Sequence, residues 1–190
     1  MLPLSCAHEK RAEINRDVIV EKQGDLDHAL AQVQQRIASA MQQSQRQLQA
    51  KEFQKALDVY RSLHDKYPQE KSVDDAYVRA IEDVKRLADR AFDSEDHARA
   101  GTIYALLLKN YPSFKPFIGT LSFDRASIEA RIAECRSCLY RKGLERYREN
   151  NISGAIGIWE SILSFDPRNE ETKKAVATSK AQLRNLRDVK

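Results

Sequence analysis

The residues of this chain that could hold a metal or carry redox chemistry are three cysteines and four histidines. Cys135 and Cys138 form a C-x-x-C pair, a spacing that occurs in thiol redox sites and in half of a zinc site. A redox site expects a strand before its helix, and zinc needs two further ligands; the sequence offers neither. Cys135 instead continues an apolar series at helical spacing with Ile128 and Ile132. We therefore expect Cys135 to pack in a core. A redox-active or metal-bound pair stays as the alternative, which thiol titration and metal analysis can test.

The histidines and the carboxylate pairs form no recognisable catalytic pattern. The histidines lie far apart, at His8, His28, His64 and His97. The paired acids at 74–75 and 170–171 fit the first turns of helices, which such charges stabilise by about 0.3–1 kcal/mol. The sequence has no phosphate-binding glycine loop, no H-E-x-x-H and no G-x-S-x-G. We expect no catalytic residue, no metal and no cofactor, and a protein that is not an enzyme.

The third cysteine, Cys6, lies in a segment that resembles the lipidation site of bacterial lipoproteins. A small residue, Ser5, precedes it and Ala7 follows it. The resemblance implies a lipid anchor at Cys6 and a place in the cell envelope. Pro3 stands where the family usually has Leu, and the basic and apolar parts of a signal peptide are missing from the sequence as written. Two predictions stay open: a cytoplasmic protein as written, or an envelope lipoprotein whose start is truncated.

The overall composition favours a helical fold and gives no sign of a membrane span. The chain has 190 residues, of which 42% are hydrophobic and 32% charged, with 6 Gly and 5 Pro. So few turn residues argue strongly against a sandwich or a barrel. No apolar stretch approaches the roughly 20 residues that cross a bilayer. The net charge of +4, from 32 basic and 28 acidic residues, is too small and too mixed to identify a nucleic-acid binder.

One spacing pattern occurs three times along the chain. Each copy has a small residue, then an alanine twelve residues later, an aromatic residue one turn on, and a proline twelve residues after the alanine. The copies are Ser44, Ala56, Tyr60 and Pro68; Ala88, Ala100, Tyr104 and Pro112; and Gly143, Ala155, Trp159 and Pro167. A small residue lets a second helix approach closely, and the aromatic ring fills the gap beside it. Because proline ends a helix, the pattern predicts three helical hairpins.

These hairpins resemble the tetratricopeptide repeat (TPR), which combines L-G-x-x-Y in its first helix with A-x-x-x-F and a closing proline in its second. The matches cover residues 37–68, 81–112 and 136–167. Successive prolines are 44 and 55 residues apart, whereas the family repeats about every 34 residues. The resemblance implies an all-α, right-handed repeat solenoid of about seven helices. Its hairpins differ from those of the family in having longer first helices.

The segments around the three matches complete the predicted organisation. Residues 1–24 are expected to be a flexible arm, and a helical repeat domain covers 25–190. A long N-terminal helix is predicted to begin at Gly24-Asp25, and a capping helix covers 169–188. Further helices are expected at 73–93 and 123–149, with a loop at 113–120.

The resemblance places the binding surface on the first helices, on the side away from their partners. The predicted groove residues are Leu48, Lys85, Phe92, Tyr140, Leu144, Tyr147 and Arg148. The alternative is that Leu48, Phe92 and Tyr147 pack on neighbouring helices. Family members that bind chaperone tails have Lys and Asn where this chain has Met41 and Gln45. Chaperone-tail binding is therefore not expected.

These observations predict a non-enzymatic scaffold or adaptor that binds a peptide or helix of a protein partner in the groove. The alternative is nucleic-acid binding through the basic helix 131–148. The basic residues behind this alternative are Arg136, Arg141, Lys142, Arg146 and Arg148, and Tyr140 and Tyr147 are interleaved with them. Glutamates at 134, 145 and 149 dilute this charge, so a protein partner is favoured over nucleic acid.

Overall fold

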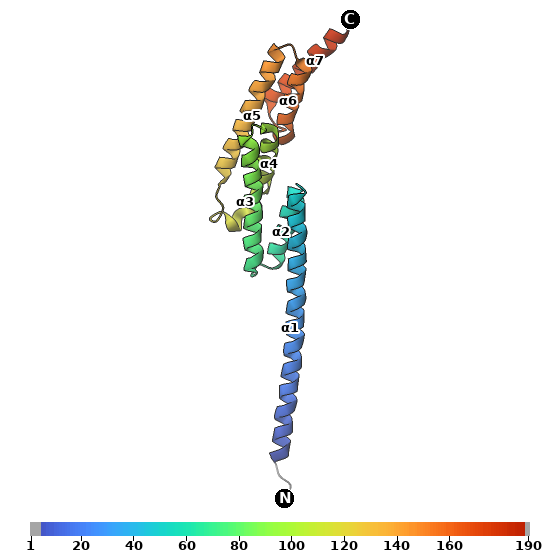
Figure 1. Cartoon of the computed structure of the whole chain (residues 1–190), viewed down its shortest axis with the longest axis vertical. Helices are drawn as coiled ribbons and strands as arrows, with labels where there is room; N and C mark the ends of the chain where they lie inside the picture. Colours follow the sequence, from blue (N-terminus) through green and yellow to red (C-terminus); the bar gives the residue numbers. More distant parts are fainter. Residues whose placement is uncertain (1–4, 189–190) are drawn as a thin grey trace.

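The computed structural model describes the backbone of residues 5–188 and the side chains of residues 27–186. Within that range the chain is helical and contains no strand, which confirms the all-α prediction. The elements are α1 (Ser5–Gln49), α2 (Phe53–Lys66), α3 (Lys71–Asp93), α4 (His97–Asn110), the 3-10 helix η1 (Tyr111–Phe117), α5 (Arg125–Arg148), α6 (Ile152–Phe165) and α7 (Glu170–Asp188). They form an elongated array with α1 at one end and α7 at the other (Figure 1).

Three pairs of helices, α1 with α2, α3 with α4 and α5 with α6, are joined by turns of the same geometry. Each turn has one left-handed residue: Lys51 (φ 63°), Glu95 (φ 59°) and Asn150 (φ 61°). In the first turn the Glu52 amide donates to the Gln47 carbonyl oxygen at 2.8 Å, and the other two turns are closed by the equivalent bond at 2.9 Å. This is the Schellman ending of a helix. It recurs at the same 44- and 55-residue intervals as the prolines.

Inside the hairpins, the small residues stand where two helices come close. The Ser44 hydroxyl is buried and donates to the Ala56 carbonyl oxygen at 2.9 Å. Gly143 faces Trp159, whose Nε1 donates to the carbonyl oxygen of Tyr140 at 3.2 Å. In the middle hairpin Ala88 and Ala100 are both fully buried, as are Ala56 and Ala155.

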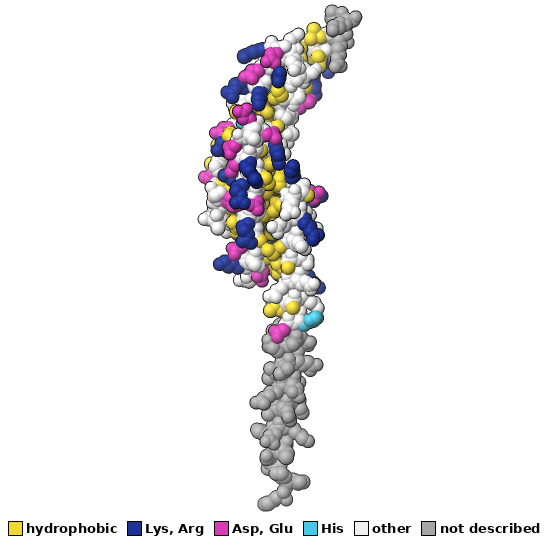
Figure 2. Space-filling view, in the orientation of Figure 1, with side chains coloured by type: hydrophobic (Ala, Val, Ile, Leu, Met, Phe, Trp, Pro, Cys, Tyr) yellow, Lys and Arg dark blue, Asp and Glu magenta, His cyan; other side chains and the backbone are white. Residues whose placement is uncertain are grey.

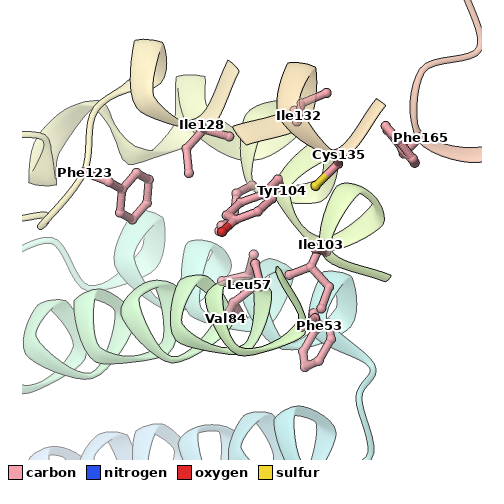
Figure 3. Packing of buried hydrophobic residues seen from close by; sticks show 14 of the residues in the cluster. Phe53, Leu57, Val84, Ile103, Tyr104, Phe123, Ile128, Ile132, Cys135 and Phe165 are labelled. Carbon is pink, nitrogen blue, oxygen red and sulfur yellow. The ribbon is translucent and has the colours of Figure 1, made fainter. Parts of the chain in front are cut away.

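The hairpins pack on one another through a common core. Contacts join α2 to α3 and α4 to α5, α1 also touches α3, and α7 packs on α6. Tyr104 of α4 lies between Ile128 and Cys135 of α5 on one side and Leu57 and Val84 on the other (Figure 3). Its hydroxyl donates to Asp89 Oδ1 at 2.7 Å. Burial of the ring, followed by this carboxylate, raises the pKa of the Tyr104 phenol.

The predicted start of the first helix at Gly24-Asp25 is wrong, because α1 begins at Ser5. One glycine inside a helix costs only about 1 kcal/mol relative to alanine. The residues before it include Ala, Glu, Lys and Arg, which favour helix and outweigh that cost. The predicted arm, residues 1–24, is thus part of α1 from Ser5 onward. The side chain of Cys6 lies outside the described residues.

The segment predicted as a loop at 113–120 is in its first part the 3-10 helix η1. Two of its aromatic side chains, Phe114 and Phe117, are buried. Their rings contact Tyr77 edge-on, with centroids 6.2 and 5.4 Å apart. The prolines suggested a loop, but burial of these rings holds the segment in a compact helical turn.

Candidate functional site

A cleft of about 830 Å³ opens between α1 and α3, the first helices of the first two hairpins. Its floor consists of apolar and small side chains: Ala38, Met41, Leu48, Tyr60, Ala76, Ala80 and Leu87. Alanines on both helices leave space that larger residues would fill. Figure 2 shows hydrophobic side chains along the seam between α1 and α3, with Lys and Arg side chains beside them.

The two walls of this cleft differ in chemistry. The α1 wall carries amides, Gln42, Gln45 and Gln49, which are neutral and exposed. The α3 wall carries Arg79, Asp83 and Arg90, and Lys51 and Arg99 stand at the end where α1 and α3 finish. Helical spacing produces both walls, because residues three, four, seven and eleven apart share a face.

The charges of the cleft are unbalanced. Its acidic side chain, Asp83, is already paired with Arg86 of the same helix. None of the four lining cations, Lys51, Arg79, Arg90 and Arg99, forms an ion pair with any residue whose side chain the structure describes. All four are exposed. The cleft therefore presents unpaired positive charge around an apolar floor.

The structure separates the predicted groove residues instead of gathering them in one groove. Leu48 lines the α1/α3 cleft. Lys85 forms an ion pair with Asp89, with 2.8 Å between Lys85 Nζ and Asp89 Oδ2. Phe92 is half-buried beneath the Arg131 guanidinium, which lies 4.5 Å from the ring centre. Lys85 and Phe92 thus make contacts within the chain.

Three further predicted groove residues, Tyr140, Leu144 and Tyr147, face α7. They line a hollow of about 310 Å³ together with residues of that helix. The Tyr147 hydroxyl donates to Gln182 Oε1 at 2.5 Å. Burial, and then the nearby Glu171 carboxylate, raises the pKa of Tyr140. For Tyr147 the bond to Gln182 of α7 fits the alternative of packing on a neighbouring helix. Arg148 is exposed.

The basic helix 131–148 is partly neutralised within the chain. Arg136 pairs with Asp166 at 2.7 Å, and Arg131 pairs with Glu134 at 2.9 Å. Arg146 pairs with Glu149 at 3.2 Å. These pairs leave Arg141, Lys142 and Arg148 as the exposed cations of this helix with no ion pair in the described part of the chain.

The cysteine pair lies on α5, and in the described region it belongs to no cluster of metal-binding side chains. Cys135 is fully buried, as predicted, and both Cys135 and Cys138 are free thiols. Burial, with Cys138 nearby, raises the pKa of the Cys135 thiol to about 11, which disfavours the nucleophilic thiolate. Among residues 27–186, no group of three or more His, Cys, Asp or Glu side chains could hold a metal ion. No helix in the described part of the chain is both long and apolar enough to span a bilayer.

The sequence prediction missed most residues of the cleft. Arg79 and Arg90 share the face of α3 that carries Ala76, Ala80 and Leu87. This spacing is visible in the sequence. The positions predicted on α3, Lys85 and Phe92, do not line the cleft: Lys85 pairs with Asp89, and Phe92 lies beneath Arg131 of α5.

Comparison with known proteins gives this chain no relative: no family model, no curated protein and no solved structure matches it.

Proposed function

We propose that this protein is a non-enzymatic adaptor, built as a TPR-like repeat solenoid, that binds a segment of another protein across its first helices. The observation that carries the proposal is the α1/α3 cleft, with an apolar floor and four cations around it that form no ion pair with the described side chains. Apolar surface supplies affinity when it is buried, and polar groups around it fix the orientation of the ligand.

The repeat assignment is supported by the recurring geometry of the hairpins. Their three turns share one left-handed residue and one closing hydrogen bond. Second helices pack on the first helices of the following hairpins. Arrays of this kind hold their first helices side by side, and extended binding surfaces arise from such stacking.

The proposal predicts that a partner contacts the cleft face of α1 and not its opposite face. A photo-cross-linking amino acid is placed at Gln45, which lines the cleft, or at Gln43, which is outside the cleft lining. Both are exposed glutamines of one helix, about 200° apart around its axis. The full chain carrying each change is irradiated in its native cells.

We expect Gln45 to yield a defined cross-linked protein that Gln43 does not yield. Equal products from both positions, or none from Gln45, would contradict the proposal. Circular dichroism of both variants serves as the control for folding, since neither side chain is buried.

A further inference from the structure

We infer that the α1/α3 cleft takes an acidic amphipathic helix, with its apolar stripe on the cleft floor and its carboxylates directed at α3. This inference rests on the proposed adaptor function and specifies the chemistry of the partner. It follows from three properties of the cleft: its shape, the difference between its walls, and the charge at one end.

The shape of the cleft suits a third helix. The lining residues run from Ala38 to Gln49 on α1 and from Ala76 to Arg90 on α3. At a rise of about 1.5 Å per residue these walls are about 17 and 21 Å long, or about three to four helical turns. Ala76 and Ala80 are one turn apart and let a helix approach α3 closely, so that its ridge of side chains fits between the two walls.

The α3 wall of the cleft is positively charged and the α1 wall is neutral, so the side of the ligand that faces α3 should be acidic. Arg79 and Arg90 are eleven residues apart, which places them on one face of α3 about 17 Å from each other along the axis. Both guanidinium groups are exposed and unpaired among the described residues. A ligand helix with two carboxylates about three turns apart would meet both. Its other flank, against the glutamines of α1, needs polar groups without charge.

The end of the cleft sets the direction of the ligand. Lys51 and Arg99 stand where α1 and α3 finish, and Arg90 lies close to the same end of α3. The C-terminal end of a helix carries partial negative charge and is stabilised by nearby cations. The bound helix therefore has its C-terminus at this end, and it runs parallel to α1 and α3.

The first test is a selection on the full chain from a display library of random 16-residue peptides. We expect the enriched peptides to be net negative, with apolar residues at helical spacing and two carboxylates about three turns apart. Enrichment of neutral or basic peptides would overturn the inference. So would enrichment of proline-rich, extended peptides.

The second test exchanges charges between the cleft and an enriched peptide. The double change Arg79→Glu and Arg90→Glu should weaken binding about tenfold or more, and a peptide with Lys in place of its two acids should recover it. The control is Arg141→Glu with Arg148→Glu, which changes the net charge of the chain equally but on α5, and it should leave binding within about twofold. Equal losses in both variants, or no recovery, would contradict the inference.

Failure of this inference and failure of the adaptor function give different results. If Gln45 cross-links a partner through a segment that is not acidic, the adaptor function stands and the acidic ligand is wrong. If neither cross-linking nor peptide selection gives a product that depends on the cleft, both are wrong.

Discussion

Gly143 shows how a single residue sets the distance between two helices. A methyl group on its Cα would overlap the Trp159 indole, with Cδ1 only 2.6 Å away. The ring cannot withdraw easily, because Trp159 is buried and bonded through Nε1 to Tyr140. Gly157, in α6, has nothing within 4 Å of the same position.

Two glycine-to-alanine changes should therefore have opposite effects. Gly143→Ala should lower the free energy of unfolding by about 1–3 kcal/mol, because it overpacks the contact between α5 and α6. Gly157→Ala should raise it by about 0.5–1 kcal/mol, since alanine is the better helix residue where space is free. Urea denaturation followed by circular dichroism measures both. A stabilising Gly143→Ala would contradict the close approach.

Buried tyrosines should make the fold sensitive to alkali. Burial raises the pKa of Tyr60, Tyr77 and Tyr104 above the ordinary value near 10.0. When the chain unfolds, these phenols ionise at that ordinary value, so the unfolded state is favoured as the pH rises beyond it. The unfolding temperature should be steady below about pH 9 and fall progressively as the pH rises past about 10, toward the raised pKa values of the folded state.

The tyrosine effect can be assigned by one substitution. Tyr104→Phe should reduce the alkaline fall in the unfolding temperature, while costing about 1 kcal/mol at neutral pH through loss of the hydrogen bond to Asp89. Asp89 keeps its ion pair with Lys85 in this variant. An alkaline profile identical to that of the unchanged chain would show that Tyr104 does not contribute.

At this scale the sequence could predict the hairpin contacts but not the cleft. The contacts between the two helices of a hairpin follow from residue type and spacing. Close approach of two helices needs small residues, as at Ser44 and Gly143, and the space beside them is filled by an aromatic ring, as at Trp159. The width of the α1/α3 cleft depends on the distance and angle at which the first two hairpins pack. No local pattern encodes that packing, so the role of Arg79 emerges only from the structure.

The three hairpin turns carry strain that glycine would relieve. Lys51, Glu95 and Asn150 adopt positive φ, a conformation that costs residues with a side chain about 1–2 kcal/mol. Asn tolerates it better than Lys or Glu, because its short polar side chain bonds locally. The same turn is therefore built at three positions with unequal strain.

Glycine substitutions at these turns should stabilise the fold most where the strain of the replaced residue is greatest. Glu95→Gly should raise the free energy of unfolding by about 0.5–1 kcal/mol, since the relief of strain exceeds the entropy that glycine adds to the unfolded chain. Asn150→Gly should raise the free energy of unfolding by less than Glu95→Gly does. Glu95→Ala, which keeps a Cβ, is the control and should show no such gain. Chemical denaturation measures all three, and a loss of stability in Glu95→Gly would contradict the turn geometry.

The ends of helices can be predicted where capping residues determine them. They cannot be predicted where packing against distant residues determines them. Asp124 caps the start of α5: its carboxylate accepts from the Ser127 amide, and its own amide donates to the Ser127 hydroxyl. At the start of α7, Asn169 accepts from the Thr172 amide. Such caps can be seen in the sequence. No helix begins at Gly24, because the residues before it favour helix and α1 already starts at Ser5. The 3-10 helix η1 forms because Phe114 and Phe117 are buried.

For the molecule as a whole, α7 closes one end of the array. It packs on α6, the most apolar of the described α-helices, and buries Thr172, Val176 and Ser179 in the process. The bond from Tyr147 to Gln182 joins it also to α5. In the proposed repeat architecture α7 would be the end cap that such arrays need, because a terminal hairpin cannot cover its own apolar face.

Removal of α7 should destabilise the array and make it associate. A chain that stops after Arg168 should lose about 3 kcal/mol or more, at about 1.5 kcal/mol for each apolar side chain that is no longer buried. It should also form oligomers in analytical ultracentrifugation. A chain that stops after Arg184 keeps the buried residues of α7 and is the control. Equal stability of the two truncated chains would contradict the covering role.

The length of α1 has a mechanical consequence. Its 45 residues span about 68 Å, whereas α2 beside it, with 14 residues, spans about 21 Å. Within the described residues, much of α1 extends past the hairpins as a projecting rod (Figure 1). Anything attached near Ser5 would be carried several nanometres from the cleft by a stiff spacer, whose reach is set by helical rise and not by the statistics of a loose tether.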